Sequence, residues 1–257
     1  MTILQTIAMG KITGEIIVAV LAMHLLLATA VLAGTPAAGT SGSPGFGAAP
    51  VPPGNLPVVE LPAPDPGNDA LAIIFSGDGG WADLDREFGN LFQQQGIATV
   101  GFDCLKYFWK PRQPAQVAID LETIMRHYLK EWGKKRVMLL GYSFGASWLP
   151  LAVNRLPVDL QDRISLLVLL APGKYTNIEI KIGDWFRNIR RAGALDVTEA
   201  AAALRPPLLC VYGTEDKEDS LCPQLGGRNR RIMVVPGGHH FNHDYAPIQH
   251  TILKYFE

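Results

Sequence analysis

The sequence predicts an α/β fold, with a mostly parallel central sheet that carries helices on both faces. Short, almost continuous apolar runs alternate along the chain with longer amphipathic stretches. Strands that are apolar throughout are buried on both sides, and in a sheet this requires a helical layer on each face. The length of 257 residues suits one such domain.

The expected strands are short runs of consecutive apolar residues between turn-forming residues. In chain order they cover residues 71–75, 97–102, 137–140, 166–170, 208–212 and 231–235. The expected helices repeat apolar residues at helical spacing. They cover residues 83–95, 114–132 and 245–256. Because many unrelated folds share this alternation, it predicts an architecture but no chemistry.

The chain begins with an apolar segment typical of exported proteins. Residues 16–33 read IIVAVLAMHLLLATAVLA and follow Lys11. We predict that residues 1–33 are a signal peptide cleaved after Ala33. The alternative is an uncleaved N-terminal anchor, because about 18 apolar residues is near the lower limit for a membrane span. Both interpretations export the rest of the chain.

Residues 34–57 are rich in Gly and Pro. Such a segment buries too little apolar surface to offset the entropy of ordering it, so we predict a flexible linker. The folded domain is expected to occupy residues 58–257. The whole chain has 23 basic and 24 acidic residues, a net charge of -1. Nucleic-acid-binding proteins have a basic excess on one face, so we expect no nucleic-acid partner.

The strongest functional signal is the pentapeptide GYSFG at residues 141–145. It follows an expected strand and opens a helix, which is the context of the nucleophile elbow in the α/β-hydrolase fold. The glycines two positions from Ser143 leave room for the sharp turn that exposes its hydroxyl. The alternative is that Ser143 only caps a helix. The context favours a catalytic serine and the α/β-hydrolase fold.

A serine nucleophile needs a base and an acid, and in this fold they follow it in the order acid, then histidine. Asp216 follows the fifth expected strand, where the acid belongs; Glu215 and Asp219 in the same loop are alternatives. His239 lies in a glycine-rich loop after the sixth strand and is the expected general base. The adjacent His240 is the alternative base.

Other ligand types are less consistent with these loops. His239, His243 and Asp244 have a spacing that can suit zinc, but the elbow already accounts for a histidine there, so we predict no metal. The loop SGDGGW at residues 76–81 lacks the lysine and the spacing of a phosphate-binding loop, and we predict no cofactor. The same loop follows an early strand, where the oxyanion hole draws its second donor. We expect the backbone N–H groups of Asp78 and Phe144 to fill that role.

The chain has three cysteines. Cys210 and Cys222 lie close in sequence, and in an oxidising compartment they can form a disulfide. The alternative is that both, like Cys104, are small buried side chains with free thiols.

Several segments between about Leu71 and the C-terminus match one known family, and together they are far more specific than the elbow alone. They are SGDGGW at 76–81, DCLKYFW at 103–109, Asp120-Leu121, GYSFGASWLP at 141–150, NRLP at 154–157, YGTED at 212–216 and GGHHF at 237–241. Through them the chain resembles the VirJ/AcvB family of bacterial virulence proteins.

This resemblance implies an exported, periplasmic α/β-hydrolase that cleaves the aminoacyl ester of aminoacyl-phosphatidylglycerol, with lysyl or alanyl head groups. It also implies a phospholipid substrate at the membrane surface and a link to virulence and type IV secretion components. An aminoacyl group carries a protonated amine, so we expect Asp83 and Asp85, beside Asp78, and the neighbouring Trp81 to bind substrate. The alternative is that the aspartates complement the dipole of the following helix.

Two aromatic segments are candidates for an apolar rim that contacts lipid, namely residues 107–109 and Trp185-Phe186. Aromatic residues more often belong to a core, which is the alternative here. Two competing functions use the same sequence features. One is a general exported carboxylesterase or lipase, and the other is a secretion-system accessory protein without catalysis.

Overall fold

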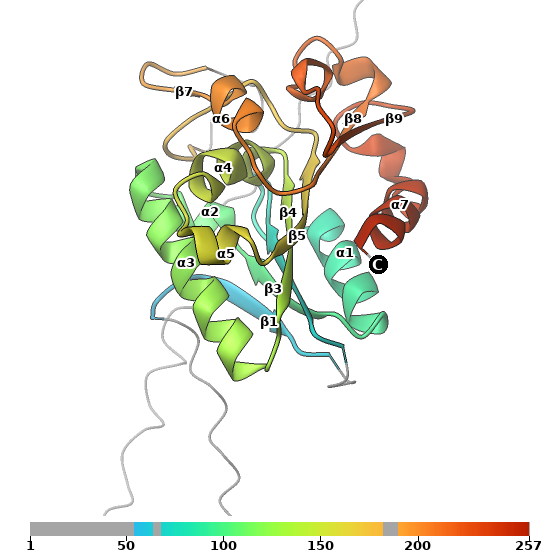
Figure 1. Ribbon diagram of the computed structural model, residues 1–257. Helices are drawn as coiled ribbons and strands as arrows, with labels where there is room; N and C mark the ends of the chain where they lie inside the picture. Colours follow the sequence, from blue (N-terminus) through green and yellow to red (C-terminus); the bar gives the residue numbers. More distant parts are fainter. Residues whose placement is uncertain (1–53, 64–67, 182–189, 257) are drawn as a thin grey trace, which may run out of the picture. The chain divides into compact units, whose positions relative to one another are not determined.

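The computed structural model describes residues 54–63, 68–181 and 190–256. Across these ranges the chain builds a seven-stranded sheet in the order β1-β3-β2-β4-β5-β8-β9 (Figure 1). Neighbouring strands run parallel, except that β1 pairs with β3 in the antiparallel direction. The predicted α/β class with a mostly parallel sheet is therefore confirmed.

The strands of this sheet correspond to the apolar runs of the sequence. Their bounds are β1 Val58–Leu61, β2 Ala70–Phe75, β3 Ala98–Phe102, β4 Arg136–Tyr142, β5 Ile164–Leu170, β8 Leu208–Gly213 and β9 Arg230–Val235. All but β1 were expected, each within two residues of its observed bounds. The sequence VVEL of β1 is interrupted by Glu60, so it shows no continuous apolar run, and its side chains are only partly buried.

The central strands are buried on both faces because successive side chains point to opposite sides of the sheet. In β2, Leu71, Ile73 and Phe75 face one apolar core, whereas Ala72 and Ile74 face a second core across the sheet. All five side chains are at most 1% exposed. The continuous apolar runs of the sequence thus serve two cores at once.

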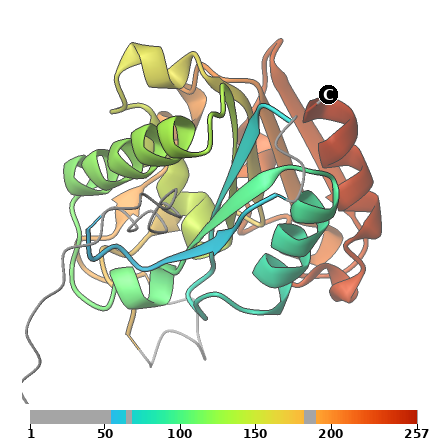
Figure 2. The same cartoon turned by 90° about the horizontal axis from the view of Figure 1, so that it is seen from below.

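Two helical layers cover these cores (Figures 1 and 2). One layer contains α1 Asp83–Gln94 and α7 Ala246–Phe256. The other contains α2 Cys104–Tyr107, α3 Pro114–Glu131, α4 Phe144–Val153, α5 Val158–Gln161 and α6 Thr198–Ala202. The short helices α2, α5 and α6 were not expected from the sequence because four or five residues are too few to display a helical period.

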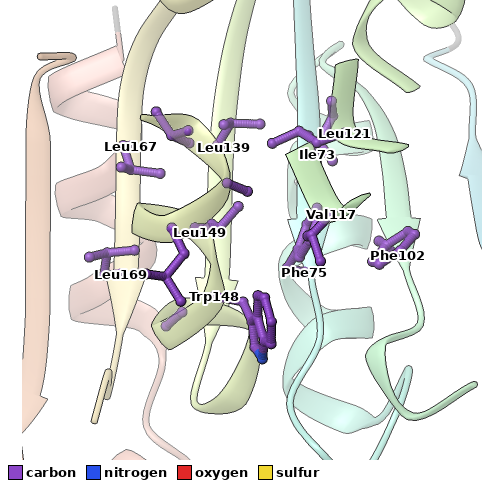
Figure 3. Packing of buried hydrophobic residues seen from close by; sticks show 14 of the residues in the cluster. Ile73, Phe75, Phe102, Val117, Leu121, Leu139, Trp148, Leu149, Leu167 and Leu169 are labelled. Atoms are coloured by element: carbon purple, nitrogen blue, oxygen red, sulfur yellow. The ribbon is translucent and has the colours of Figure 1, made fainter. Parts of the chain in front are cut away.

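Aromatic residues anchor the core beneath α3 and α4 (Figure 3). The rings of Phe75 and Phe102, on neighbouring strands, are stacked with centroids 4.6 Å apart. Trp148 on α4 is fully buried, and its indole N–H donates to the carbonyl of Asn177 at 3.1 Å. This contact ties α4, which begins directly after Ser143, to the segment that follows β5.

The remaining elements lie in the connections. A two-stranded ribbon pairs β6 Tyr175–Thr176 with β7 Leu195–Asp196, and the 3-10 turns are η2 Thr214–Asp216, η3 Cys222–Gln224 and η4 Phe241–His243. The carboxyl ends of parallel strands meet at one edge of a sheet, which is where open α/β folds bind ligands. The loops after β2, β4, β8 and β9 therefore share one edge.

The predicted signal peptide or anchor, residues 1–33, lies outside the described residues, as does the predicted linker 34–57 up to Pro53. The first described strand begins at Val58, the expected start of the folded domain. In the described ranges, no helix has both the length and the apolar character needed to cross a bilayer.

Candidate active site

The GYSFG segment forms a sharp turn between β4 and α4. Ser143 has φ 52° and ψ −110°, a backbone conformation that L-residues rarely adopt. Its amide donates to the carbonyl of Leu170 at 2.8 Å, and its carbonyl accepts from the amide of Ser147 at 3.0 Å. Such strain persists only where surrounding structure enforces it, and it is concentrated at functional sites.

The two glycines of this turn are required by close backbone contacts. A Cβ on Gly141 would lie 2.6 Å from the Cα of Ala146. A Cβ on Gly145 would lie 2.5 Å from the carbonyl oxygens of Phe75 and Ser76. Because these neighbours are backbone atoms, they cannot move aside. The spacing of glycines on which the sequence prediction relied thus has a direct steric cause.

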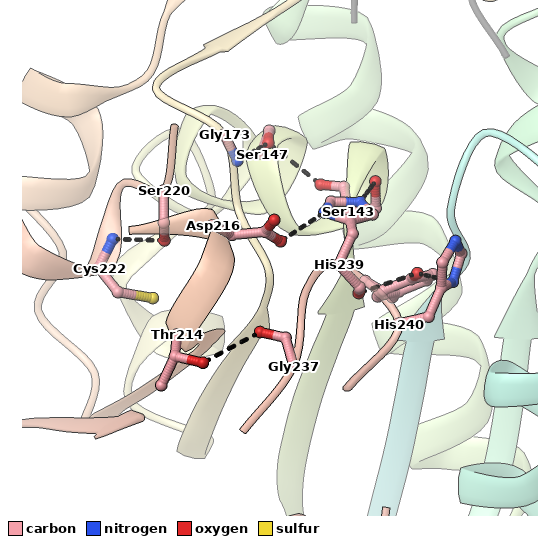
Figure 4. Close-up of polar contacts among 11 residues, drawn as sticks. Ser143, Ser147, Gly173, Thr214, Asp216, Ser220, Cys222, Gly237, His239 and His240 are labelled. Carbon is pink, nitrogen blue, oxygen red and sulfur yellow. Dashed lines mark hydrogen bonds and ion pairs between the residues drawn. The ribbon is translucent and has the colours of Figure 1, made fainter. Parts of the chain in front are cut away.

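Three side chains from separate loops form one hydrogen-bonded chain (Figure 4). His239, after β9, places Nε2 2.7 Å from Oγ of Ser143. Its Nδ1 lies 3.1 Å from Oδ2 of Asp216, at the end of η2 after β8. The structure therefore brings together all three residues of the expected nucleophile, base and acid.

The alternative acids and the alternative base occupy different positions. Glu215 and Asp219 are exposed to solvent. Among the described residues, the carboxylate that His239 contacts is that of Asp216. His240 turns away from Ser143, and its Nδ1 lies 2.8 Å from the hydroxyl of Tyr142. Burial, followed by the neighbouring His239 and His243, lowers the pKa of His240. The geometry thus favours Asp216 and His239 over these neighbours.

A disulfide encloses the loop that carries Asp216. Cys210 in β8 and Cys222 in η3 are joined, and both side chains are fully buried. Between them, the carbonyl of Asp216 accepts hydrogen bonds from the amides of Asp219 and Ser220, at 3.1 and 2.9 Å. Cys104 is a free, buried thiol, and burial raises its pKa well above the usual value.

A cavity of about 660 Å³ opens above Ser143. Phe144 and Asp78, the expected oxyanion donors, both line it. The loop that carries Asp78 is a tight turn closed by a hydrogen bond from the amide of Gly80 to the carbonyl of Gly77, at 3.1 Å. Ser143, His239 and both donor residues therefore share one cavity.

Of the three residues expected to bind substrate, two line this cavity. Asp83 is exposed and pairs with Arg86 at 3.5 Å. Asp85 is 1% exposed, and its Oδ2 accepts from the amide of Ala82 at 3.2 Å. In the described part of the chain, its Oδ1 is buried without a hydrogen-bond partner. Burial is the main reason that the pKa of Asp85 rises from 3.8 to about 7.

Trp81 does not line the cavity. Its indole lies over Gly101 of β3 and Gly89 of α1, where a Cβ on Gly101 would come within 2.3 Å of the ring. The side chain therefore packs between a strand and a helix, against the core beneath α1. The prediction that Trp81 binds substrate is not supported by this position, because the loop turns its side chain inward.

Comparison with known proteins identifies the family. The family described as bacterial virulence protein (VirJ) matches residues 69–257. The chain belongs to the VirJ family. The resemblance drawn from the sequence segments is thereby confirmed. No curated protein sequence matches this VirJ-family chain.

Solved structures of similar fold cover most of the VirJ-family chain. The esterase Pf2001 from Pyrococcus furiosus has 16% identity and a TM-score of 0.53, over 78% of this chain and 91% of its own. Est1E from Butyrivibrio proteoclasticus, bound to ferulic acid, has 15% identity and a TM-score of 0.57, over 78% and 93%. MenH from S. aureus has 12% identity and a TM-score of 0.57, over 77% and 97%. At these identities the likeness shows the α/β-hydrolase fold, as predicted.

Two residues that support the VirJ-family site were not among the predicted site residues. Ser147 is 3% exposed; its Oγ donates to the carbonyl of Ser143 at 3.1 Å and accepts from the amide of Gly173 at 2.9 Å (Figure 4). Tyr142 fixes His240 through its hydroxyl. Both residues belong to the segment GYSFGAS around the nucleophile, which was the only sign of a role in the sequence. Their partners His240 and Gly173 are too distant in sequence to be inferred from it.

The structure also places the residues of the metal alternative and of the two aromatic segments that were candidates for a lipid-contacting rim. The Nδ1 of His243 lies 3.1 Å from the hydroxyl of Tyr245, and the described residues contain no group of three or more metal-ligating side chains. Tyr107 and Phe108 are buried in the core, as the alternative interpretation held, whereas Trp109 is 53% exposed. Trp185 and Phe186 lie outside the described residues.

Proposed function

We propose that this protein is a serine ester hydrolase with Ser143 as nucleophile, His239 as general base and Asp216 as the orienting acid. The observation that carries the proposal is the pair of contacts made by His239, 2.7 Å to Oγ of Ser143 and 3.1 Å to Oδ2 of Asp216. A serine hydroxyl is a weak nucleophile until a base within hydrogen-bond reach accepts its proton. These contacts provide the base and hold its ring.

The reaction follows from this arrangement. Oγ of Ser143 attacks the ester carbonyl while its proton passes to Nε2 of His239, and Asp216 stabilises the resulting imidazolium. The C–O bond then breaks, and the leaving alcohol takes the proton from His239. A water molecule, deprotonated by His239, attacks the acyl-serine and releases the acid. One ester and one water thus give one acid and one alcohol.

Two backbone groups are proposed to stabilise the negative charge on the carbonyl oxygen. Phe144 begins α4, so its N–H is among those at a helix N-terminus that have no partner within the helix. Asp78 lies in the tight turn after β2, which lines the same cavity. Donors held by fixed backbone require no reorganisation as the charge develops, which is why such holes contribute strongly to catalysis.

The proposed substrate is aminoacyl-phosphatidylglycerol, with a lysyl or alanyl group. Membership of the VirJ family suggests it, and the acidity of the cavity supports it. Asp78, Asp83 and Asp85 line the wall beside Ser143. Asp85 in particular has a buried oxygen without a partner, and a protonated amine would pair with it and favour its ionised form. Hydrolysis would release the free amino acid and leave phosphatidylglycerol.

A broader exported carboxylesterase or lipase is the second candidate. Apolar side chains, among them Phe144 and Ile180, line part of the cavity and could accept an acyl chain. A non-catalytic secretion accessory is disfavoured, because a binding surface requires no histidine poised between a strained serine and a carboxylate. A link to virulence or to type IV secretion components stays a proposal that rests on the family.

We also propose that the protein acts in the periplasm. The disulfide between Cys210 and Cys222 supports an oxidising compartment, since such bonds are rare where thiols are kept reduced. The apolar run at residues 16–33 is consistent with export, whether it is cleaved or remains as an anchor.

The direct test incubates the full chain with lysyl- and alanyl-phosphatidylglycerol and, separately, with simple acyl esters. The Ser143→Ala variant is the control for each substrate. Release of free amino acid by the wild type alone would support the proposal and rank the two head groups. Turnover restricted to simple esters would favour the carboxylesterase. Equal results for wild type and Ser143→Ala on every substrate would contradict the hydrolase.

A further inference from the structure

Trp109 is a large apolar side chain that the fold holds in solvent. It follows α2 at the edge of the sheet where the strands end, and it is 53% exposed. The two residues before it, Tyr107 and Phe108, are almost fully buried. Exposure of an indole is unfavourable in water, and Trp side chains are enriched at protein and membrane interfaces, where one end is apolar and the other wet.

The backbone around Trp109 is fixed from both sides. Phe108 packs against Trp148 and Phe144, with ring centroids 4.6 and 4.9 Å apart. The carbonyl of Phe108 accepts from the amide of Ile180, and the amide of Arg112 donates to the carbonyl of Ile178, each at 2.8 Å. The orientation of Trp109 toward solvent is therefore built into the loop.

Cations surround this indole. Trp109 lines a shallow hollow of about 550 Å³ with Leu105, Lys106, Tyr107, Lys110 and Arg112, and we call these six residues the Trp109 face. Lys106 pairs with the buried Asp103 at 2.9 Å, and the guanidinium of Arg112 lies 4.2 Å from the centre of the Tyr107 ring. Lys110 is exposed. Of the six residues, three are basic and none is acidic.

We propose that the Trp109 face docks on the surface of an anionic phospholipid bilayer. Indole rings favour the boundary between acyl chains and head groups, and basic side chains beside them are attracted to anionic lipids. The net charge of the chain is -1, so this attraction is local to the face. The inference deepens the proposed function and rests on it for the choice of lipid over another anionic surface.

The loop that carries the face is joined to the wall of the active cavity through the buried side chain of Phe108. Phe108 contacts Phe144, the residue after Ser143, and Ile180, which hydrogen-bonds to Phe108, lines the cavity. Trp109 follows the end of β3 and Ser143 follows the end of β4, so a bilayer in contact with Trp109 would lie on the side of the sheet that carries Ser143. A lipid head group could then reach Ser143 while its acyl chains stay in the membrane.

The test measures quenching of tryptophan fluorescence by vesicles whose acyl chains are brominated. It uses the full chain with Ser143→Ala, which lacks the proposed nucleophile and cannot consume lipid through it. None of the five tryptophans precedes residue 81, so the apolar N-terminal run contributes no fluorescence of its own and is common to every variant compared. We expect stronger quenching by vesicles containing phosphatidylglycerol than by phosphatidylcholine alone. Most of that difference should disappear in Trp109→Phe and persist in Trp132→Phe.

Charge reversal tests the electrostatic part. Lys110→Glu should raise the lipid concentration at half-maximal quenching by about fivefold or more. Lys135→Glu is the control, because it changes the net charge equally but lies at the opposite edge of the sheet, before β4. It should shift the lipid concentration at half-maximal quenching by less than about twofold. Undiminished quenching in Trp109→Phe, or equal shifts in both charge variants, would overturn the proposal. Every protein in this test carries Ser143→Ala, so the test measures binding alone. Hydrolysis by the wild type is decided separately, by the experiment on aminoacyl-phosphatidylglycerol.

Discussion

At the scale of single residues, activation of Ser143 depends on which histidine faces it. The Nε2 of His239 is within hydrogen-bond distance of Oγ, and its other nitrogen contacts Asp216. The proton of Ser143 can move only to a nitrogen that carries none, so Asp216 must accept from Nδ1–H and select that tautomer. His240 has its Nδ1 engaged by Tyr142, and burial disfavours its charged form.

The two adjacent histidines therefore give a sharp prediction. His239→Ala should lower kcat for ester hydrolysis by roughly 10⁴-fold or more, because the base is removed. His240→Ala should retain activity within about tenfold, because it leaves the chain from Ser143 to Asp216 intact. Steady-state rates on one soluble ester would measure both. The reverse order of the two losses would show that the assignment of the base is wrong.

Asp85 gives a prediction about stability and pH. Because burial raises its pKa from 3.8 to about 7, the folded chain holds this proton more tightly than the unfolded chain does. The resulting stabilisation is fully present below about pH 4 and is lost as the pH rises through about 7. From pH 4 to pH 8, the wild type should lose roughly 2–4 kcal/mol of unfolding free energy relative to Asp85→Asn.

Urea unfolding at several pH values would measure this difference. Asp83→Asn is the matched control, since Asp83 lies two residues away but its side chain is 91% exposed. Its profile should run parallel to that of the wild type. A parallel profile for Asp85→Asn as well would contradict the description of Asp85 as a buried proton-binding group.

At the scale of elements, the elbow depends on a close approach between α4 and β2. A Cβ at position 145 would meet two backbone carbonyl oxygens at 2.5 Å. We expect Gly145→Ala to lower the unfolding free energy by about 1–3 kcal/mol and, by shifting Ser143, to lower ester turnover about 100-fold. Gly226→Ala, where nothing lies within 4 Å, should change neither quantity appreciably. Unchanged turnover in Gly145→Ala would mean that the elbow tolerates displacement.

The disulfide at the base of the acid loop is the second element-scale feature. It joins cysteines 12 positions apart and closes the segment that presents Asp216. Replacing both Cys210 and Cys222 by serine should lower the unfolding free energy by about 2–4 kcal/mol and reduce activity. In a reducing agent, the urea midpoint of the wild type should approach that of the double variant. Cys104 is a free thiol, so the reducing agent should not change stability through it. Equal midpoints for wild type and double variant would exclude a stabilising bridge.

At the scale of the whole molecule, the sequence predicted the parts that depend on periodicity and local sterics. The apolar runs of the strands and the GYSFG turn are such parts, because their causes lie within a few residues. The edge strand β1 was missed because Glu60 interrupts its apolar residues, and the short helices because four or five residues are too few to display a helical period. The sequence favoured His239 but left His240 open, and the contact of His239 with Ser143, like the inward position of Trp81, depends on the packing of separate loops.

The central claim is that His239 and Asp216 activate Ser143 as a nucleophile. The most direct measurement treats the full chain with an organophosphonate ester and locates the adduct by peptide mass spectrometry. We predict one phosphonylated peptide, modified at Ser143, and its loss in Ser143→Ala and in His239→Ala but not in His240→Ala. An unmodified Ser143 in the folded wild type, or equal labelling in His239→Ala, would contradict the account.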